Sequence, residues 1–339
     1  MSVILAIRMS LPLVWMDRSG KKLTELAAAA GWAGVSLSPD GKRVAVHRHD
    51  SDGGDVVIFE PGQTTPAKFT FDAAQDNSAP VWTPAGTQVA FASHRNGKWG
   101  IYIKLADNTR NEELLLESDV PVVPMSWSPD GQTLVYWTRA PKTQGDAWAL
   151  PMKGEKKPFP ILNSAADERH PQISPDGRWI AYSSNETGRS EVYVQPFPQG
   201  TKIQISLNGG VYPRWGDGGK EVFFMNLISV GNLMASTVHV TGSAIQRDDP
   251  KVLFQTGYFN SLHAAGQYHP YAVSADGQRF LLPQVDNPLA VLQGRGGRGG
   301  VAGGVIGSIA ADRHATTSPS GAAASINVIL NWTTVLKEN

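Results

Sequence analysis

The chain of 339 residues contains no cysteine, which excludes disulfide bonds, thiolate metal sites and a cysteine nucleophile. Charge is also scarce: 18% of the residues are charged, and 30 basic residues balance 30 acidic ones with no long basic run. Binding of nucleic acid or of a membrane surface through bulk charge is therefore not expected. No apolar run reaches the roughly 18 residues of a membrane-spanning helix, so membrane insertion is not expected either.

Signatures of familiar enzymes are missing as well. The sequence has no G-x-S-x-G nucleophile elbow and no HExxH zinc motif, and no long segment shows helical periodicity. Residues 1–15 are apolar, but Arg8 interrupts them, and they lack the basic start and cleavage site of a secretory signal. We expect a β-strand in this segment, with a signal as the alternative.

What the sequence does contain is a repeated turn motif. The tetrapeptide Ser-Pro-Asp-Gly and its variants occur six times, 42 to 58 residues apart, and end at Gly41, Gly86, Gly131, Gly177, Gly219 and Gly277. Proline sets φ for the first central position of a type I turn, aspartate suits the second, and glycine takes the left-handed position that follows. Because a large apolar residue precedes each turn and a short apolar run follows it, each motif predicts a β-hairpin.

Six hairpins at this period predict one all-β domain over residues 1–339, a six-bladed β-propeller of four-stranded antiparallel blades. Strands expected at 13–16 and 326–332 would pair to close the ring and remove an open edge. The sequence leaves open which terminus supplies which strand of the shared blade. Residues 287–324 are rich in Gly and Ala, with eight glycines between 294 and 307, and we expect a flexible insertion in the last blade.

The fourth unit carries the fullest form of the repeat, PQISPDGRWIAYSS at 171–184 followed by EVYV at 191–194. It resembles the WD-like repeat of TolB-type six-bladed propellers, over about residues 11–285. The segments LVWMDRSGK at 13–21 and VILNW at 328–332 are similar to the sensor-like propellers attached to bacterial serine/threonine kinases, although no kinase motif is present. The resemblance implies a bacterial sensor or scaffold outside the cytoplasm, in the periplasm.

Histidines mark one face of the expected ring. His170 and His269 precede innermost strands, and His47, His49 and His94 follow second strands; both kinds of position lie opposite the turns in a propeller blade. Neutral imidazoles with a carboxylate suit a divalent cation such as zinc, manganese or calcium. The candidate metal ligands are therefore His170, His269, His47 and His49. The alternative interpretation is a set of polar loop residues with no shared site.

The same face supplies the other candidate residues. His170 is the candidate catalytic base, with Glu168 adjusting its pKa. The candidate ligand-binding residues stand before innermost strands or after a second strand, and they are Trp32, Asn77, His94, Arg169, Tyr212 and Tyr268.

Two functions remain open on the sequence, which does not decide whether the protein is an enzyme. The first is a monomeric binding module that needs no cofactor and takes a small molecule, peptide or protein at the channel-mouth face. The second is a metal-assisted hydrolase of lactones, esters or phosphotriesters with its His/Glu site at that mouth, an analogy with other six-bladed propellers. The lack of a catalytic signature favours the binding module.

Overall fold

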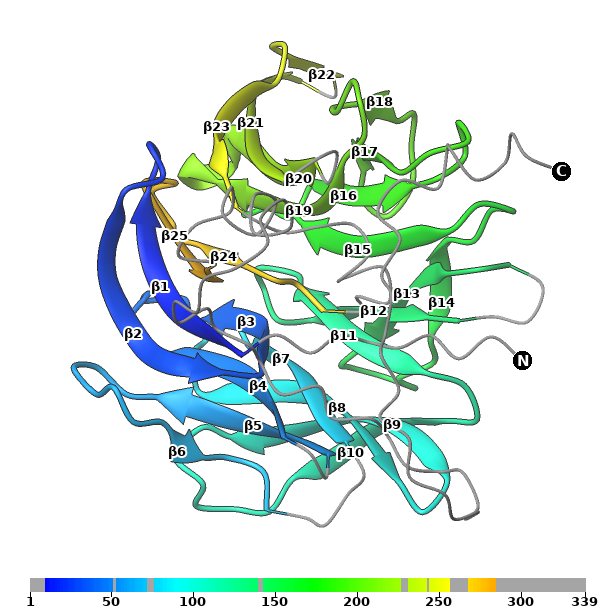
Figure 1. Ribbon diagram of the computed structural model, residues 1–339. Helices are drawn as coiled ribbons and strands as arrows, with labels where there is room; N and C mark the ends of the chain where they lie inside the picture. Colours follow the sequence, from blue (N-terminus) through cyan, green and yellow to red (C-terminus); the bar gives the residue numbers. More distant parts are fainter. Residues whose placement is uncertain are drawn as a thin grey trace, which may run out of the picture. The chain divides into compact units, whose positions relative to one another are not determined.

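The computed structural model of the protein describes residues 10–50, 53–71, 76–139, 143–226, 231–242, 244–256 and 268–284. These residues form six antiparallel sheets, arranged as the blades of a β-propeller (Figure 1). The predicted fold class is thus confirmed. The described part of the protein contains one 3-10 turn, η1 (Asp217–Gly219), and we find in it no helix with the length and hydropathy needed to cross a bilayer.

Blades 1 to 4 each take four consecutive strands, and the first strand of each lies nearest the centre of the ring (Figure 1). Blade 1 has β3 (Trp32–Leu37), β4 (Val44–Asp50), β5 (Gly53–Phe59) and β6 (Ala67–Lys68). Blade 2 has β7 (Asp76–Trp82), β8 (Gln88–Arg95), β9 (Lys98–Leu105) and β10 (Glu113–Ser118). Blade 3 has β11 (Val122–Trp127), β12 (Thr133–Thr138), β13 (Asp146–Pro151) and β14 (Phe159–Leu162). Blade 4 has β15 (Glu168–Ile173), β16 (Trp179–Ser184), β17 (Glu191–Pro196) and β18 (Ile203–Gln204).

The last two blades depart from this plan. Blade 5 has β19 (Val211–Gly216), β20 (Glu221–Asn226) and the long β21 (Asn232–Thr241), whose outer edge is shared by β22 (Ala244–Arg247) and β23 (Lys251–Gln255). Blade 6 is built from both ends of the described residues, in the order β24 (Ala272–Val273), β25 (Arg279–Pro283), β1 (Leu11–Asp17) and β2 (Lys22–Ala30). The N-terminal strands therefore close the ring by pairing with β25. The strand expected at 326–332 and the insertion expected at 287–324 lie outside the described residues.

The Ser-Pro-Asp-Gly turns hold each hairpin through a repeated set of contacts. In blade 4, Ser174 Oγ donates to Asp176 Oδ1 at 2.5 Å and accepts a hydrogen bond from the Trp179 amide at 3.0 Å. The Gly177 amide donates to the Ser174 carbonyl at 2.9 Å. The same serine–aspartate bond forms at Ser38, Ser128 and Ser274. The polar groups of the motif are thus used within the turn, which is a structural role.

The turn glycines also bring neighbouring blades together. Gly86 and Gly177 have φ of +67° and +74°, a conformation that residues with a Cβ rarely adopt. A Cβ on Gly86 would lie 3.3 Å from Pro39 Cδ of the preceding turn, and one on Gly177 would lie 3.3 Å from Pro129 Cδ. At these two boundaries the proline of one turn packs on the glycine of the next, which holds the turns of neighbouring blades together on one face of the ring.

Four inner strands carry a bulge at the same position of the repeat, seven residues before the turn glycine. Gly34, Ala79, His170 and Tyr212 have φ between +51° and +57° there, and the pairing with the next strand shifts register around each of them. A bulge bends a strand and redirects its side chains. As a result the rings of His170 and Tyr212, from different blades, lie 4.2 Å apart.

Apolar layers between neighbouring blades form the core. Between blades 5 and 6, Phe280 packs edge-on against Phe223 and Phe254, with ring centroids 5.1 and 5.7 Å apart. Arg18, in the turn after β1, donates to both carboxylate oxygens of Glu221 at 2.8 and 2.9 Å. The boundary at which the ring closes is therefore stabilised by an aromatic layer and by a bidentate ion pair.

Candidate functional site

The face opposite the turns, which we call the channel-mouth face, carries the predicted site residues. It is formed where inner strands begin and second strands end, since the two strands are antiparallel: Ala33 pairs with His47, and Asp76 pairs with His94. Two clusters lie on it. We call His47, His49 and Asp76 the His47 group, and His170, Tyr212 and His269 the His170 group.

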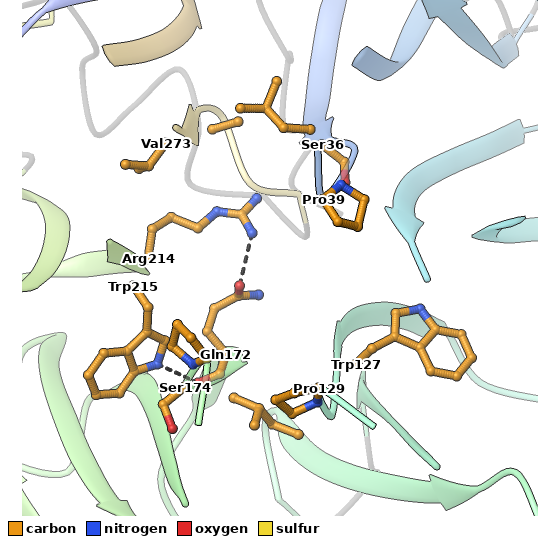
Figure 2. Close-up of a pocket in the computed structure, with 13 residues that line it drawn as sticks. Ser36, Pro39, Trp127, Pro129, Gln172, Ser174, Arg214, Trp215 and Val273 are labelled. Atoms are coloured by element: carbon orange, nitrogen blue, oxygen red, sulfur yellow. Dashed lines mark hydrogen bonds between the residues drawn. The ribbon is translucent and has the colours of Figure 1, made fainter. Parts of the chain in front are cut away.

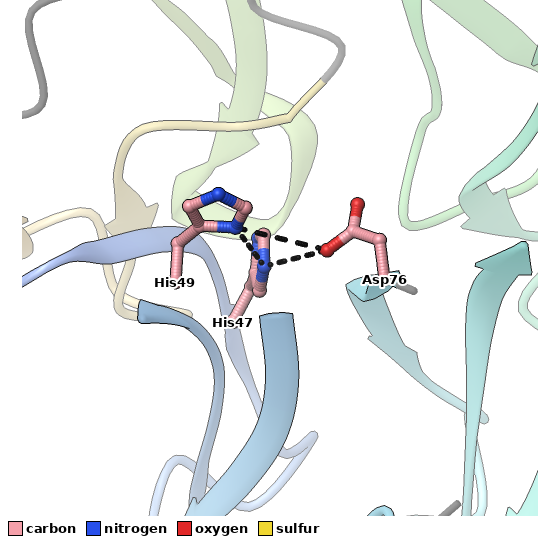
Figure 3. Close-up of side chains that lie close together, drawn as sticks. All are labelled: His47, His49 and Asp76. Carbon is pink, nitrogen blue, oxygen red and sulfur yellow. Dashed lines mark hydrogen bonds and ion pairs between the residues drawn. The ribbon is translucent and has the colours of Figure 1, made fainter. Parts of the chain in front are cut away.

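The His47 group joins two blades. His47 and His49 are two residues apart on β4, so their imidazoles leave the same side of the strand. Nε2 of His47 lies 3.3 Å from Oδ1 of Asp76, and Nδ1 of His49 lies 3.7 Å from the same oxygen (Figure 3). The two ring nitrogens are 3.4 Å apart. Within the described ranges, this is the one group of three His, Asp or Glu side chains whose ligand atoms all lie within 4.8 Å of one another.

The donor set of the His47 group fits a divalent cation. Two imidazole nitrogens and one carboxylate oxygen are ligands that zinc accepts, and they leave further positions for water or substrate. Burial opposes ionisation of Asp76, but hydrogen bonds and charge from His47 and His49 outweigh it and hold the pKa of that carboxyl well below its usual range. The carboxylate is therefore ionised, as a metal ligand must be.

Two further residues shape this group. A Cβ on Gly54 of β5 would overlap both Nε2 of His47 and Oδ1 of Asp76, so only glycine leaves room for the pair. The hydroxyl of Tyr268 lies 3.5 Å from Oδ2 of Asp76, and its ring centroid lies 5.2 Å from that of His47. Tyr268 thus lies beside the group and contacts two of its three members.

The His170 group is more deeply packed. Nδ1 of His170 lies 3.0 Å from Ser183 Oγ, and its ring centroid lies 5.7 Å from that of His269. His269 is 6% exposed, and its Nε2 accepts a hydrogen bond from Gln172 at 3.0 Å. Burial, with the positive charge of Arg214 and of His170, holds the pKa of His269 well below its usual range, so this imidazole is neutral. Burial also raises the pKa of Tyr212 to about 12.

Glu168, which was expected to adjust the pKa of His170, forms its hydrogen bonds with Ser164 instead. Its carboxylate accepts hydrogen bonds from the Ser164 amide at 3.2 Å and from the Ser164 hydroxyl. Burial raises the pKa of Glu168, and the nearby charge of Asp146 adds to that effect. His170, His269 and Glu168 do not form a group with ligand atoms within 4.8 Å.

The other predicted residues are distributed around the face. Trp32 donates Nε1 to the Ala28 carbonyl at 2.8 Å, Asn77 accepts from Ser93 Oγ at 2.8 Å, and Arg169 pairs with Asp167 at 2.8 Å. The ring of His94 lies 4.6 Å from that of Trp99.

Sequence reasoning missed Asp76, although it directly precedes Asn77, which the same reasoning selected.

Comparison with known proteins places this geometry in context. No family model matches the chain. It is 28% identical over 153 residues to the Tol-Pal system protein TolB of Francisella tularensis subsp. tularensis, a match that covers 45% of this chain and 35% of that protein. It is 26% identical over 206 residues to an uncharacterized protein of Agrobacterium fabrum, which covers 60% of this chain and 66% of that protein. The chain therefore matches less than two thirds of the length of each relative.

Similarity of structure extends further than similarity of sequence. The solved structure of a protein assigned as TolB from Agrobacterium tumefaciens matches with a TM-score of 0.63 at 18% identity, over 81% of this chain and 97% of that one. Together with the six antiparallel sheets described above, these matches show that the protein has the six-bladed β-propeller fold of TolB-like proteins.

Proposed function

We propose that this propeller is a non-catalytic binding module, a sensor or scaffold that holds a ligand or a protein segment at the channel-mouth face. The observation that carries the proposal is that polar and aromatic side chains from different blades meet there. Tyr268 contacts both His47 and Asp76, and the ring of His170 lies against Tyr212 and near His269. The serines and aspartates of the opposite face are, by contrast, bonded to one another within their turns.

The similarity to TolB supports a protein as the partner. The Francisella relative is by name a component of the Tol-Pal system. By extension we propose that this protein works as a monomer outside the cytoplasm and binds a protein of the bacterial cell envelope. The channel-mouth face presents hydrogen-bonding side chains at the centre and loops around it, as surfaces that recognise a peptide segment commonly do.

Affinity capture tests this proposal. The purified propeller is immobilised, and a bacterial periplasmic extract is passed over it. We expect a partner to bind the wild type, to be lost with Tyr268→Ala, and to be retained with Lys42→Glu, a matched change on the turn face. A reproducible hydrolytic activity that disappears with His170→Ala would contradict a purely binding role.

A metal-assisted hydrolase of lactones, esters or phosphotriesters is the second candidate, and the His47 group is the observation that favours it. His47, His49 and Asp76 would hold zinc, manganese or calcium, and such a cation would supply a Lewis acid. Elemental analysis followed by assays on those three substrate classes separates the two candidates. Turnover that is lost with His47→Ala supports the hydrolase, whereas a bound metal without turnover supports the binding module.

A further inference from the structure

The centre of the ring is closed by a guanidinium. Arg214 of β19 points to the middle of the ring (Figure 2). Its Nη1 donates to Oε1 of Gln172 on β15 at 2.9 Å, and its Nη2 donates to the carbonyl of Val35 on β3 at 3.3 Å. Gln172 in turn donates to the carbonyl of Met125 on β11 at 2.7 Å. A single hydrogen-bonded bridge thus connects blades 5, 4, 3 and 1 across the axis.

The charge of Arg214 has no counterion within the described part of the protein. None of the ion pairs there includes it, and no carboxylate contributes to its pKa. Its Nε is buried and makes no hydrogen bond. Burial lowers the pKa of Arg214 to about 10, so the group is still cationic at neutral pH. A buried charge without a counterion costs free energy, and an anionic ligand would offset that cost.

Arg214 lies against a cavity on the turn face. The cavity has a volume of about 360 Å³, within the range of small-molecule sites. Among the described residues that line it, Arg214 is the one that carries a charge, and none is acidic. Polar and apolar groups share its walls about equally, and the apolar part includes the prolines of three turns: Pro39, Pro129 and Pro175. Ile173 and Val273 extend this apolar part of the wall.

We propose that this cavity binds a small carboxylate with an apolar body. A guanidinium has five N–H donors, and the bonds to Gln172 and Val35 use two of them. The two remaining Nη hydrogens can pair with the oxygens of a planar carboxylate. The prolines would contact the apolar part of the ligand. This cavity lies on the turn face, opposite the channel-mouth face proposed above as the binding surface. A test of one proposal therefore does not decide the other.

Phenylacetate is the probe, and phenylacetamide is its neutral counterpart of nearly the same shape. Binding is measured by isothermal titration calorimetry and by the rise in Tm. We expect phenylacetate to bind with a Kd of about 1 mM and to raise Tm. The amide should bind at least about tenfold more weakly, because it lacks the charge that pairs with Arg214. Arg214→Met should abolish binding, whereas Arg214→Lys should restore part of it.

Two further arms keep the test decisive. Val273→Trp narrows the cavity without changing the guanidinium, so it should also abolish binding and serves if Arg214→Met does not fold. An acetylated dipeptide that ends in a free phenylalanine carboxylate is compared with its C-terminal amide. Tighter binding of this peptide than of phenylacetate identifies the terminal carboxylate of a polypeptide as the ligand group; the reverse identifies a free acid.

Three results would overturn the proposal. The first is equal binding of phenylacetate and phenylacetamide, since the charge would then play no part. The second is binding that survives in both Arg214→Met and Val273→Trp. The third is inorganic phosphate binding as tightly as phenylacetate, because the apolar walls would then contribute nothing.

Discussion

Nε2 of His47 lies 3.3 Å from Oδ1 of Asp76, although the two residues belong to different blades. The approach requires Gly54 on β5, where a side chain would overlap both atoms. Three strands therefore contribute to one polar group, which can form only after blades 1 and 2 have packed together. A ligand bound at this group would stabilise the contact between the two blades.

The first prediction concerns zinc. We expect the purified protein to bind about one Zn²⁺ per molecule, as the donor set of the His47 group implies. His49→Ala removes one of three ligands, so it should weaken binding by more than the roughly 10–100-fold that follows loss of an outer-shell partner. Competition with a chelating dye measures the affinity. His94→Ala, on the same face but outside the group, is the control, and an equal loss there would place the metal elsewhere.

The second prediction concerns the repeated bulge. Gly34 and Ala79 occupy the same position in blades 1 and 2, with φ of +57° and +51°. A Cβ on Gly34 would meet no atom closer than 3.5 Å, so Gly34→Ala introduces backbone strain without a clash. Strain of about 1–2 kcal/mol exceeds the gain of about 0.4–1 kcal/mol from a stiffer unfolded state. Gly34→Ala should therefore lower the free energy of unfolding by about 0.5–1 kcal/mol.

Ala79→Gly is the matched change and is measured in the same urea titration. Glycine relieves the backbone strain, but it also raises the conformational entropy of the unfolded chain and removes a buried methyl group. The free energy of unfolding should therefore change by no more than about 0.5 kcal/mol. A Gly34→Ala variant more stable than the wild type would show that the bulge imposes no strain.

The fold was predictable because the interactions that define the repeat are local. Ser174, Asp176 and Trp179 satisfy one another within six residues, so the turn chemistry can be seen in adjacent positions of the sequence. For ring closure, the sequence indicated only that the N-terminal strand must pair with another strand, and not which one. The strand that pairs with β1 is Arg279–Pro283, far along the sequence, and the periodicity of single strands carries no information on pairing between them.

The site was less predictable because its contacts cross blade boundaries. The spacing of His47 and His49 indicates a shared face, but their carboxylate partner, Asp76, comes from the next blade. Arg214 could also have been selected from the sequence, because it is the one charged residue at its position of the repeat, five residues before the turn glycine. The matching residues of the other inner strands are uncharged, and they are Ser36, Val81, Ser126, Gln172 and Ala272. A charge at this one position of the repeat therefore marks Arg214 as the residue directed at the axis.

The third prediction is a pH dependence at Glu168. Burial raises the pKa of this carboxyl in the folded state above its ordinary value of 4.5. The folded state therefore prefers the protonated form, and stability falls as pH rises from the unfolded pKa through the folded one. Glu168→Gln removes this loss, and its amide oxygen can still accept from Ser164. The free energy of unfolding of the variant, relative to that of the wild type, should thus increase as the pH rises from 4 to 8, as measured by urea unfolding. A difference between the two proteins that does not change with pH would contradict the raised pKa of Glu168.

The fourth prediction tests ring closure. The guanidinium of Arg18 is 30% exposed and the carboxylate of Glu221 16%, and their bond is bidentate. Arg18 also donates to the Gly277 carbonyl at 3.0 Å, so it links β20 to two turns of blade 6. We expect Arg18→Ala and Glu221→Ala each to lower the free energy of unfolding by about 1–2 kcal/mol.

A double-mutant cycle shows whether this loss belongs to the ion pair. Partly buried bidentate pairs hold their geometry at lower entropic cost than exposed ones, so the coupling energy should be about 1 kcal/mol and should fall in high salt. The matched control is Arg178→Ala, because Arg178 and Asp176 form an ion pair with exposures of 58% and 41%. That change should cost less than about 0.5 kcal/mol. If the Arg18–Glu221 coupling is equally small, the closing blade is held by its aromatic layer and strand pairing alone.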